Sequence, residues 1–252
     1  MCRMLLALGN IEPKIIIEDA ALMAKDLTFD HEHNASGRGV FPHGHGWGLA
    51  YIEKNKFQVD KSVKALYKDK ERILYHNIKT SFLLIHARQA TVGKTQIHNT
   101  HPFYFVKKSI GSFIFCHNGT IKETIKHDHH FKVQGTTDSE QLFYAILTHF
   151  LPLRDPKTIP KTINEYSYPI GCNVILATPT TSYLSINCHS CPKYVEMHML
   201  QQKDKLIISS EPLPHIKGTW KELPSGTLLE IDNKTRAVKN LTPDTPKILS
   251  AL

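Results

Sequence analysis

The sequence of 252 residues lacks any apolar run that approaches the roughly 18 residues of a membrane-spanning helix. Its first segment, MCRMLLALGN, has a single Arg and a very short apolar stretch, without the length or the small-residue cleavage site of a secretory signal. We therefore expect a soluble, cytoplasmic protein that makes no use of a membrane.

Internal repeats, low-complexity tracts and Gly/Ser linkers are also missing, so we predict one domain over residues 1–252. The net charge is +8, from 31 Lys and Arg against 23 Asp and Glu, but no basic stretch is interleaved with aromatic residues. Such scattered charge indicates a solvated surface and no nucleic-acid partner.

Cysteine is scarce and irregularly spaced, with five residues in all: Cys2, Cys116, Cys172, Cys188 and Cys191. An odd number in a chain of this length argues against a disulfide scaffold and favours a reducing compartment. Cys188 and Cys191 form one CHSC tetrapeptide, and the second such pair that a zinc ribbon needs is absent. We interpret the tetrapeptide as a turn between strands.

Runs of β-branched and aromatic residues bounded by turn residues predict a strand-rich fold. The predicted strands are 48–52, 81–87, 110–116, 173–177, 182–187, 195–200, 206–209 and 227–231. Helical spacing of apolar residues predicts a helix over 13–27, followed by a polar loop over 28–46. A second helix should begin at Thr137-Asp138-Ser139-Glu140, which has capping-box spacing. Together these elements predict an α+β fold with sheet packed on sheet.

Cys2 is the first candidate for chemistry, because a small residue after Met1 allows the initiator to be removed. The thiol and the freed α-amine would then share one residue. An α-amine titrates near pH ~8, so it can serve as general base for its own thiol at physiological pH. The alternative is an ordinary apolar residue that opens a strand.

Three further motifs follow predicted strands or open a helix. Arg88, in HARQAT at the end of an apolar run, can bind a carboxylate with two parallel hydrogen bonds, or can be an edge-strand Arg in a surface ion pair. Asn118-Gly119 can supply two oxyanion donors, or form a hairpin turn. Asp138 can bind an ammonium group, or cap the helix that starts there.

In this order the Met-Cys start and HARQAT, HNTHPF (98–103), HNGTI (117–121) and TDSE (137–140) resemble the glutaminase domain of class II glutamine amidotransferases. HGHGWG (43–48) and SSEPL (209–213) are similar to the stand-alone group of that superfamily, which includes proteins implicated in hydrolysing γ-glutamyl amide linkages. The resemblance spans residues 2 to about 230.

This resemblance implies the four-layer αββα sandwich of N-terminal-nucleophile hydrolases and cleavage of a small γ-glutamyl substrate through a thioester, without a cofactor. The implied roles are nucleophile and base for Cys2, oxyanion hole for Asn118 and Gly119, carboxylate binding for Arg88, ammonium binding for Asp138, and pocket lining for Thr91 and His101.

Two positions depart from the glutamine-fed synthases of the superfamily: Gln89 replaces a frequent Trp and Val92 a frequent His. Those enzymes also carry an ammonia-using domain downstream, which we do not expect here. A partner subunit that receives ammonia or product is therefore one alternative, and a non-catalytic glutaminase-like subunit is another. Substrate choice is expected to lie in loops, with 28–45 and 122–134 as candidate lids.

The histidines suggest a less favoured alternative, a zinc-binding protein. Histidine side chains recur in polar loops at His31, His33, His43, His45, His127, His129 and His130. None has the paired spacing on a helix that would fix zinc geometry, so we predict no metal site.

Overall fold

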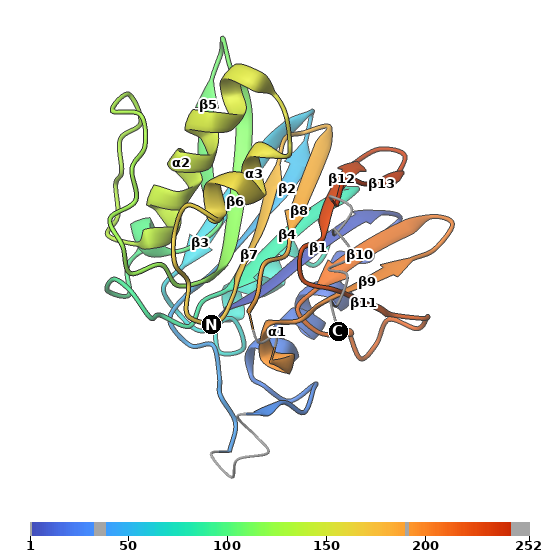
Figure 1. Cartoon of the computed structure of the whole chain (residues 1–252). Coiled ribbons are helices and arrows are strands. Elements are labelled where there is room, and N and C mark those ends of the chain that lie inside the picture. Colours follow the sequence, from blue (N-terminus) through green and yellow to red (C-terminus); the bar gives the residue numbers. More distant parts are fainter. Residues whose placement is uncertain (1, 33–38, 190–191, 243–252) are drawn as a thin grey trace, which may run out of the picture.

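Two antiparallel β-sheets lie face to face between layers of helix in the computed structural model, which describes residues 2–32, 39–189 and 192–242 (Figure 1). The seven-stranded sheet has the order β11-β9-β10-β1-β4-β2-β3, and the six-stranded sheet has the order β13-β12-β8-β7-β6-β5. Neighbouring strands in both sheets are antiparallel.

The first sheet contains β1 (Arg3–Gly9), β2 (Trp47–Glu53), β3 (Lys56–Ser62), β4 (Phe82–Ala87), β9 (Met197–Gln201), β10 (Lys205–Ser209) and β11 (Lys221–Leu223). The second contains β5 (Phe103–Lys107), β6 (Gly111–Gly119), β7 (Cys172–Ala177), β8 (Thr181–Ser185), β12 (Leu228–Asp232) and β13 (Val238–Asn240). The helices are α1 (Pro13–Ala24), α2 (Asp138–Leu153) and α3 (Thr158–Ile163), with short 3-10 turns η2 (Lys70–Tyr75), η3 (Ile97–Asn99) and η4 (Lys193–Val195).

Three buried apolar clusters hold these layers together. One cluster fills the space between the two sheets, and a second joins α1 to the outer face of the seven-stranded sheet. The third joins α2 and α3 to the outer face of the six-stranded sheet (Figure 1). A sheet buried on both faces needs nearly continuous apolar strands, and all six residues of β4 (FLLIHA) are buried. The layers confirm the predicted αββα sandwich.

The predicted strands are all present, with ends shifted by a few residues, and α2 begins at Asp138 with Thr137 as its N-cap. Thr137 Oγ1 accepts from the main-chain nitrogen of Glu140, and the helix buries Leu142, Phe143, Ile146 and Phe150, as its spacing predicts. The prediction for the first helix was too long. It ends at Ala24, because Asp26 adopts the left-handed φ of 64° and Leu27 is turned into solvent.

The sequence analysis did not predict β1, β3, β5, β11 and β13. Parts of two predicted segments, the loop over 28–46 and the CHSC turn, lie at residues 33–38 and 190–191, outside the described residues. Within the described ranges, no helix is long and apolar enough to cross a bilayer.

Candidate active site

The start of β1 and the ends of β4 and β6 come together at one edge of the sandwich. In the pairing of β1 with β4, Arg3 lies opposite Ala87, so Cys2 and Arg88 follow at adjacent positions on the two strands. The main-chain nitrogen of Cys2 donates a hydrogen bond of 2.6 Å to Asn118 Oδ1 at the end of β6. The start of the chain and the HNG motif are thereby joined across the two sheets.

The thiol of Cys2 is buried but lies next to a polar main-chain group. Only 8% of Cys2 is exposed, and its Sγ lies 3.7 Å from the carbonyl oxygen of Gln89, the residue after Arg88. Cys116 and Cys172 are free cysteines too, but both sit deeper, where burial raises the pKa of each thiol. Of these three cysteines, Cys2 is the one whose main-chain nitrogen is hydrogen-bonded to Asn118 and whose thiol lies beside the residue after Arg88.

Asn118 presents an unused donor beside this thiol. Its Oδ1 accepts from Cys2, whereas its Nδ2 is buried and has no hydrogen-bond partner among the described residues. A buried amide donor without a partner costs free energy on the order of 1–3 kcal/mol. A ligand oxygen placed there would satisfy it, which is what an oxyanion site requires.

Gly119 leaves no room for a side chain. A Cβ at this position would lie 2.4 Å from His117 Nε2 and 2.5 Å from the carbonyl oxygen of Gly171. The absent side chain therefore lets the backbone of β6 approach the segment before β7 closely, beside Asn118.

Arg88 is buried, and its guanidinium faces main-chain oxygens. Nη2 donates to the carbonyls of Val92 at 2.8 Å and Gly93 at 3.2 Å, while Nη1 reaches those of Lys94 and His45 at 3.3 and 3.5 Å. Burial lowers the pKa of Arg88, whereas the nearby Cys2 and Asp138 raise it. A carboxylate can bind this fork if the 92–94 loop gives up some of these contacts.

Asp138 begins α2, as predicted, and is buried at the helix start. Its Oδ2 accepts from the main-chain nitrogen of Ile121 at 2.7 Å, and Oδ1 lies 3.5 Å from Ser139 Oγ. The carboxylate therefore ties the segment after Gly119 to the helix and keeps further acceptor capacity on Oδ1.

The two remaining predicted pocket residues lie in different settings. Thr91 is exposed, and its hydroxyl is 2.8 Å from that of Thr120, directly after Gly119. His101 is only 2% exposed, and its ring packs 4.0 Å from that of His86 and 4.6 Å from that of Phe103. Neither ring nitrogen of His101 has a hydrogen-bond partner in the described part of the chain.

His117 was missed as a site residue although HNGTI contains it. Its Nδ1 is 2.9 Å from Ser139 Oγ and its Nε2 is 3.3 Å from Cys172 Sγ. The ring thus links the residue before Asn118 to the start of α2 and to β7. The sequence pattern indicates a role for the neighbouring Asn118 as a donor, but it does not indicate that the His117 ring points inward.

A buried ion-pair network behind Cys2 was also missed. Arg3 is 1% exposed, and its Nη2 lies 2.8 Å from Glu211 Oε1 and 3.7 Å from Asp26 Oδ1. Its Nη1 donates to the carbonyl oxygen of Tyr194 at 2.9 Å. Glu211 belongs to the SSEPL motif, so this motif serves to hold the residue next to Cys2.

Buried histidines under the site predict an acid-sensitive fold. Burial lowers the pKa of His86 to about 3, and it lowers the pKa of His43, His101 and His117 as well. These rings are neutral when folded, whereas an unfolded histidine binds a proton below its ordinary value of 6.5. The contribution of these histidines to stability is therefore full above pH 6.5 and is lost as the pH falls toward 3.

We expect the free energy of unfolding to fall by about 2 kcal/mol between pH 7 and pH 5, the amount for one such histidine. Urea unfolding followed over this pH range measures the effect. A flat stability profile between pH 7 and pH 5 would contradict the neutral, buried state of these rings.

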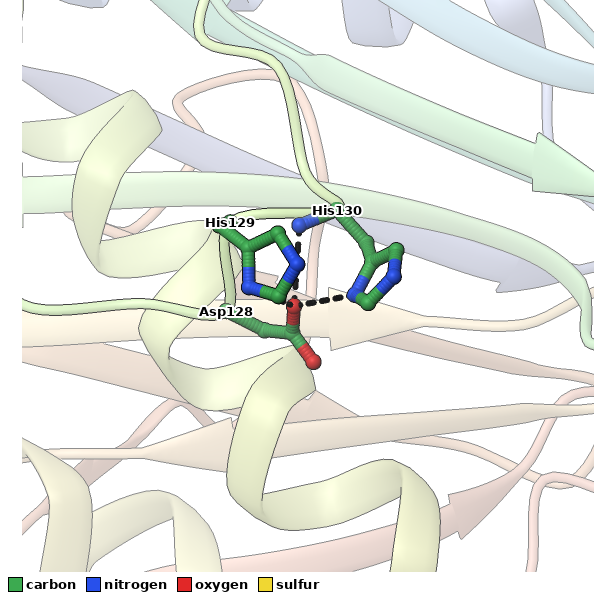
Figure 2. A group of neighbouring side chains, drawn as sticks. All are labelled: Asp128, His129 and His130. Atoms are coloured by element: carbon green, nitrogen blue, oxygen red, sulfur yellow. Dashed lines mark hydrogen bonds and ion pairs between the residues drawn. The ribbon is translucent and has the colours of Figure 1, made fainter.

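One group of surface side chains could hold a metal ion, as the zinc alternative requires. In residues 2–32, 39–189 and 192–242, the group of three or more side chains able to hold a metal ion is Asp128, His129 and His130, whose donor atoms lie within 4.8 Å of one another. Figure 2 shows the Asp128 carboxylate facing both rings, with Oδ1 2.6 Å from His130 Nδ1 and 3.5 Å from His129 Nδ1. All three residues are exposed, and none contacts Cys2; His33 is outside the described residues.

The sequence is similar to those of known glutamine amidotransferases. The family model described as class-II glutamine amidotransferases matches residues 20–169. A putative glutamine amidotransferase of Haemophilus influenzae is 34% identical over 123 residues, which is 47% of this chain and 41% of that relative. A probable glutamine amidotransferase of Saccharomyces cerevisiae is 22% identical over 93% of this chain and 83% of its own length.

The fold also matches a solved structure. Glutamine phosphoribosylpyrophosphate amidotransferase from Bacillus subtilis superposes with a TM-score of 0.66 at 15% identity, over 96% of this chain and 50% of that one. At this identity the likeness concerns the fold, which is the αββα architecture of class II amidotransferase domains.

Proposed function

We propose that this chain, which belongs to the class II glutamine amidotransferases, cleaves the γ-amide bond of glutamine or of another γ-glutamyl compound through a thioester on Cys2. One observation carries the proposal: the Cys2 main-chain nitrogen donates to Asn118 Oδ1 at 2.6 Å. This contact supports the proposal because it joins the main-chain nitrogen of Cys2 to the side chain of Asn118, 116 residues further along the chain.

The proposed reaction has two halves. After Met1 is removed, the α-amine of Cys2 takes the thiol proton, and the sulfur adds to the γ-carbonyl carbon of the substrate. Asn118 Nδ2 and the main-chain nitrogen of Gly119 stabilise the oxyanion, and the C–N bond breaks as the amine delivers the proton to the leaving nitrogen. Water then attacks the thioester by the same route, which releases glutamate and restores the thiol.

The glutamate end of the substrate is assigned to charged groups around the thiol. Arg88 would bind the α-carboxylate and Asp138 the α-ammonium. We assign Thr91 to the exposed rim of this substrate pocket and His101 to its buried floor. Two features support this arrangement: Arg88 lies within electrostatic reach of both Cys2 and Asp138, and burial strengthens such pairs. Binding would replace contacts between Arg88 and the carbonyls of Val92 and Gly93.

Replacing Arg88 with Lys should raise KM for glutamine about tenfold to a hundredfold, with a smaller change in kcat. The ammonium of lysine cannot reproduce a two-pronged contact, and hydrogen bonds to charged groups contribute about 1.5–3 kcal/mol. Steady-state kinetics measure the effect, and urea unfolding of the variant controls for the lost carbonyl contacts. An unchanged KM would remove Arg88 from carboxylate binding.

The wider setting belongs to the same proposal. We place the reaction in the cytoplasm because it needs a free thiol at Cys2, and we assign residues 2–252 to one amidotransferase type-2 domain that uses no cofactor. Because cleavage of glutamine at this site would release ammonia, a partner chain that accepts the ammonia is compatible with the proposed reaction.

Product analysis tests the proposal. The purified chain is incubated with glutamine and, separately, with γ-glutamyl peptides, and glutamate and ammonia or amine are quantified. We expect equimolar release of the two products. Absence of release from every γ-glutamyl compound would instead favour a non-catalytic subunit.

A further inference from the structure

A pocket of about 400 Å³ opens next to Gly119, and Thr91 is the one residue of its lining to which the proposed function gives a role. Its walls come from segments that are far apart in the sequence, and six residues define its chemistry: Phe41, Val92, Thr120, Lys122, Ile170 and Tyr194. Two of them lie in the loops 28–45 and 122–134, where substrate choice is expected. The volume suits a small organic group.

Several lining residues are neighbours of the proposed reaction centre. Thr120 directly follows Gly119, and the carbonyl oxygen of Gly171, also in the lining, would lie 2.5 Å from a Cβ on Gly119. Tyr194 accepts a hydrogen bond of 2.9 Å from Arg3, the neighbour of Cys2. A group in this pocket would therefore lie beside the proposed oxyanion site.

The position of the pocket indicates which end of the substrate enters it. This inference rests on the proposed function. A γ-glutamyl amide has a glutamate end and a group beyond the scissile nitrogen. Arg88 and Asp138, the charged groups assigned to the glutamate end, are not among the residues that line the pocket, whereas Thr91 lines it and marks the border between the two ends. The group that remains for the pocket is the one that leaves with the nitrogen.

The lining also limits the chemistry of that group. Most of the walls are apolar or aromatic, so a large apolar side chain gains from burial there. Among the described residues that line the pocket, Lys122 is the one charged residue, and none carries a carboxylate. A leaving group with a carboxylate would be attracted to Lys122, whereas a cationic one would meet a like charge.

We propose that the preferred substrates are γ-glutamyl dipeptides whose second residue is large and apolar, with its carboxylate near Lys122. Such substrates fill the pocket that glutamine leaves empty, since glutamine has only an NH2 group beyond the γ-carbonyl carbon. Selectivity then resides in Phe41, Val92, Ile170 and Tyr194 for the side chain and in Lys122 for the charge.

Four substrates separate these contributions: γ-glutamylphenylalanine, γ-glutamylphenethylamine, which lacks the carboxylate, γ-glutamyllysine, and glutamine. We expect kcat/KM for γ-glutamylphenylalanine to exceed that for glutamine by about tenfold or more, as for a buried aromatic ring. It should exceed that for γ-glutamylphenethylamine about threefold to fivefold, as for an exposed ion pair. γ-Glutamyllysine should be the poorest dipeptide.

Two variants test the assigned contacts. Lys122→Met should bring the ratio between γ-glutamylphenylalanine and γ-glutamylphenethylamine close to one, whereas Ile170→Ala should lower the preference for both over glutamine. Lys126→Met is the matched control, because Lys126 is an exposed lysine of the same loop outside the pocket lining, and it should keep the wild-type ratios.

The results of these assays test the pocket assignment separately from the proposed hydrolysis at Cys2. If glutamine is hydrolysed as fast as γ-glutamylphenylalanine, and Lys122→Met leaves the ratios unchanged, the pocket assignment is overturned while the Cys2 chemistry stands. If none of the four compounds is hydrolysed, the proposed function is overturned and the pocket assignment with it.

Discussion

Replacing Cys2 with alanine is expected to lower kcat for γ-glutamyl hydrolysis by roughly four orders of magnitude or more, since the thioester cannot form without the sulfur. Alanine also allows Met1 to be removed, so the α-amine and its contact with Asn118 Oδ1 can remain in place. The expected loss therefore reports on the thiol alone. Glutamate release from glutamine, measured at saturating substrate, is the assay.

The matched control is Cys116→Ala. Cys116 is a second buried free cysteine, in β6, and burial raises the pKa of its thiol, which disfavours the nucleophilic thiolate. This variant should keep its activity after a modest loss of stability. Activity that survives in Cys2→Ala but disappears in Cys116→Ala would move the nucleophile to β6.

Asn118→Ala should lower kcat by about a hundredfold to a thousandfold, the usual effect of removing one oxyanion donor. The physical reason is the buried Nδ2, which has no partner among the described residues and can bind charge that develops in the transition state. KM should change less, because the neutral carbonyl oxygen of the bound substrate accepts a weaker hydrogen bond from this donor than the oxyanion does. Steady-state kinetics over a range of glutamine concentrations give kcat and KM separately.

Asn240→Ala offers a control at the outer edge strand β13, and its kinetics should match the wild type. Because Asn118 also holds the Cys2 nitrogen, the unfolding free energy of Asn118→Ala is measured alongside. A variant that unfolds like the wild type and retains full kcat would exclude Asn118 from the oxyanion site.

Helix α2 and the predicted strands could be inferred because their signals are local. Thr137 and the apolar spacing after it are properties of a short segment, and the cap forms as expected. By contrast, β1 has the sequence RMLLALG, and Leu, Met and Ala favour a helix when taken alone. Its strand conformation is fixed by pairing with β4 on one side and β10 on the other, which sequence propensity does not contain.

The site shows the same division between local and distant information. Arg88, Asn118 and Asp138 could be selected because each motif ends a predicted strand or begins a helix, and functional residues gather at such ends. Cys2 could be selected because it directly follows Met1. The contacts of Arg88 with the carbonyls of residues 92–94 depend on the conformation of a loop, and the Arg3–Glu211 pair joins residues 208 positions apart. Neither follows from the residue types alone.

Intact-mass analysis after incubation with a glutamine-analogue electrophile tests the central claim most directly, because one spectrum reports both Met1 removal and covalent labelling. The account predicts a chain that lacks Met1 and carries one label, which peptide mapping places on Cys2, with no label on Cys2→Ala. A chain that retains Met1, or a label that maps to another residue, would contradict it.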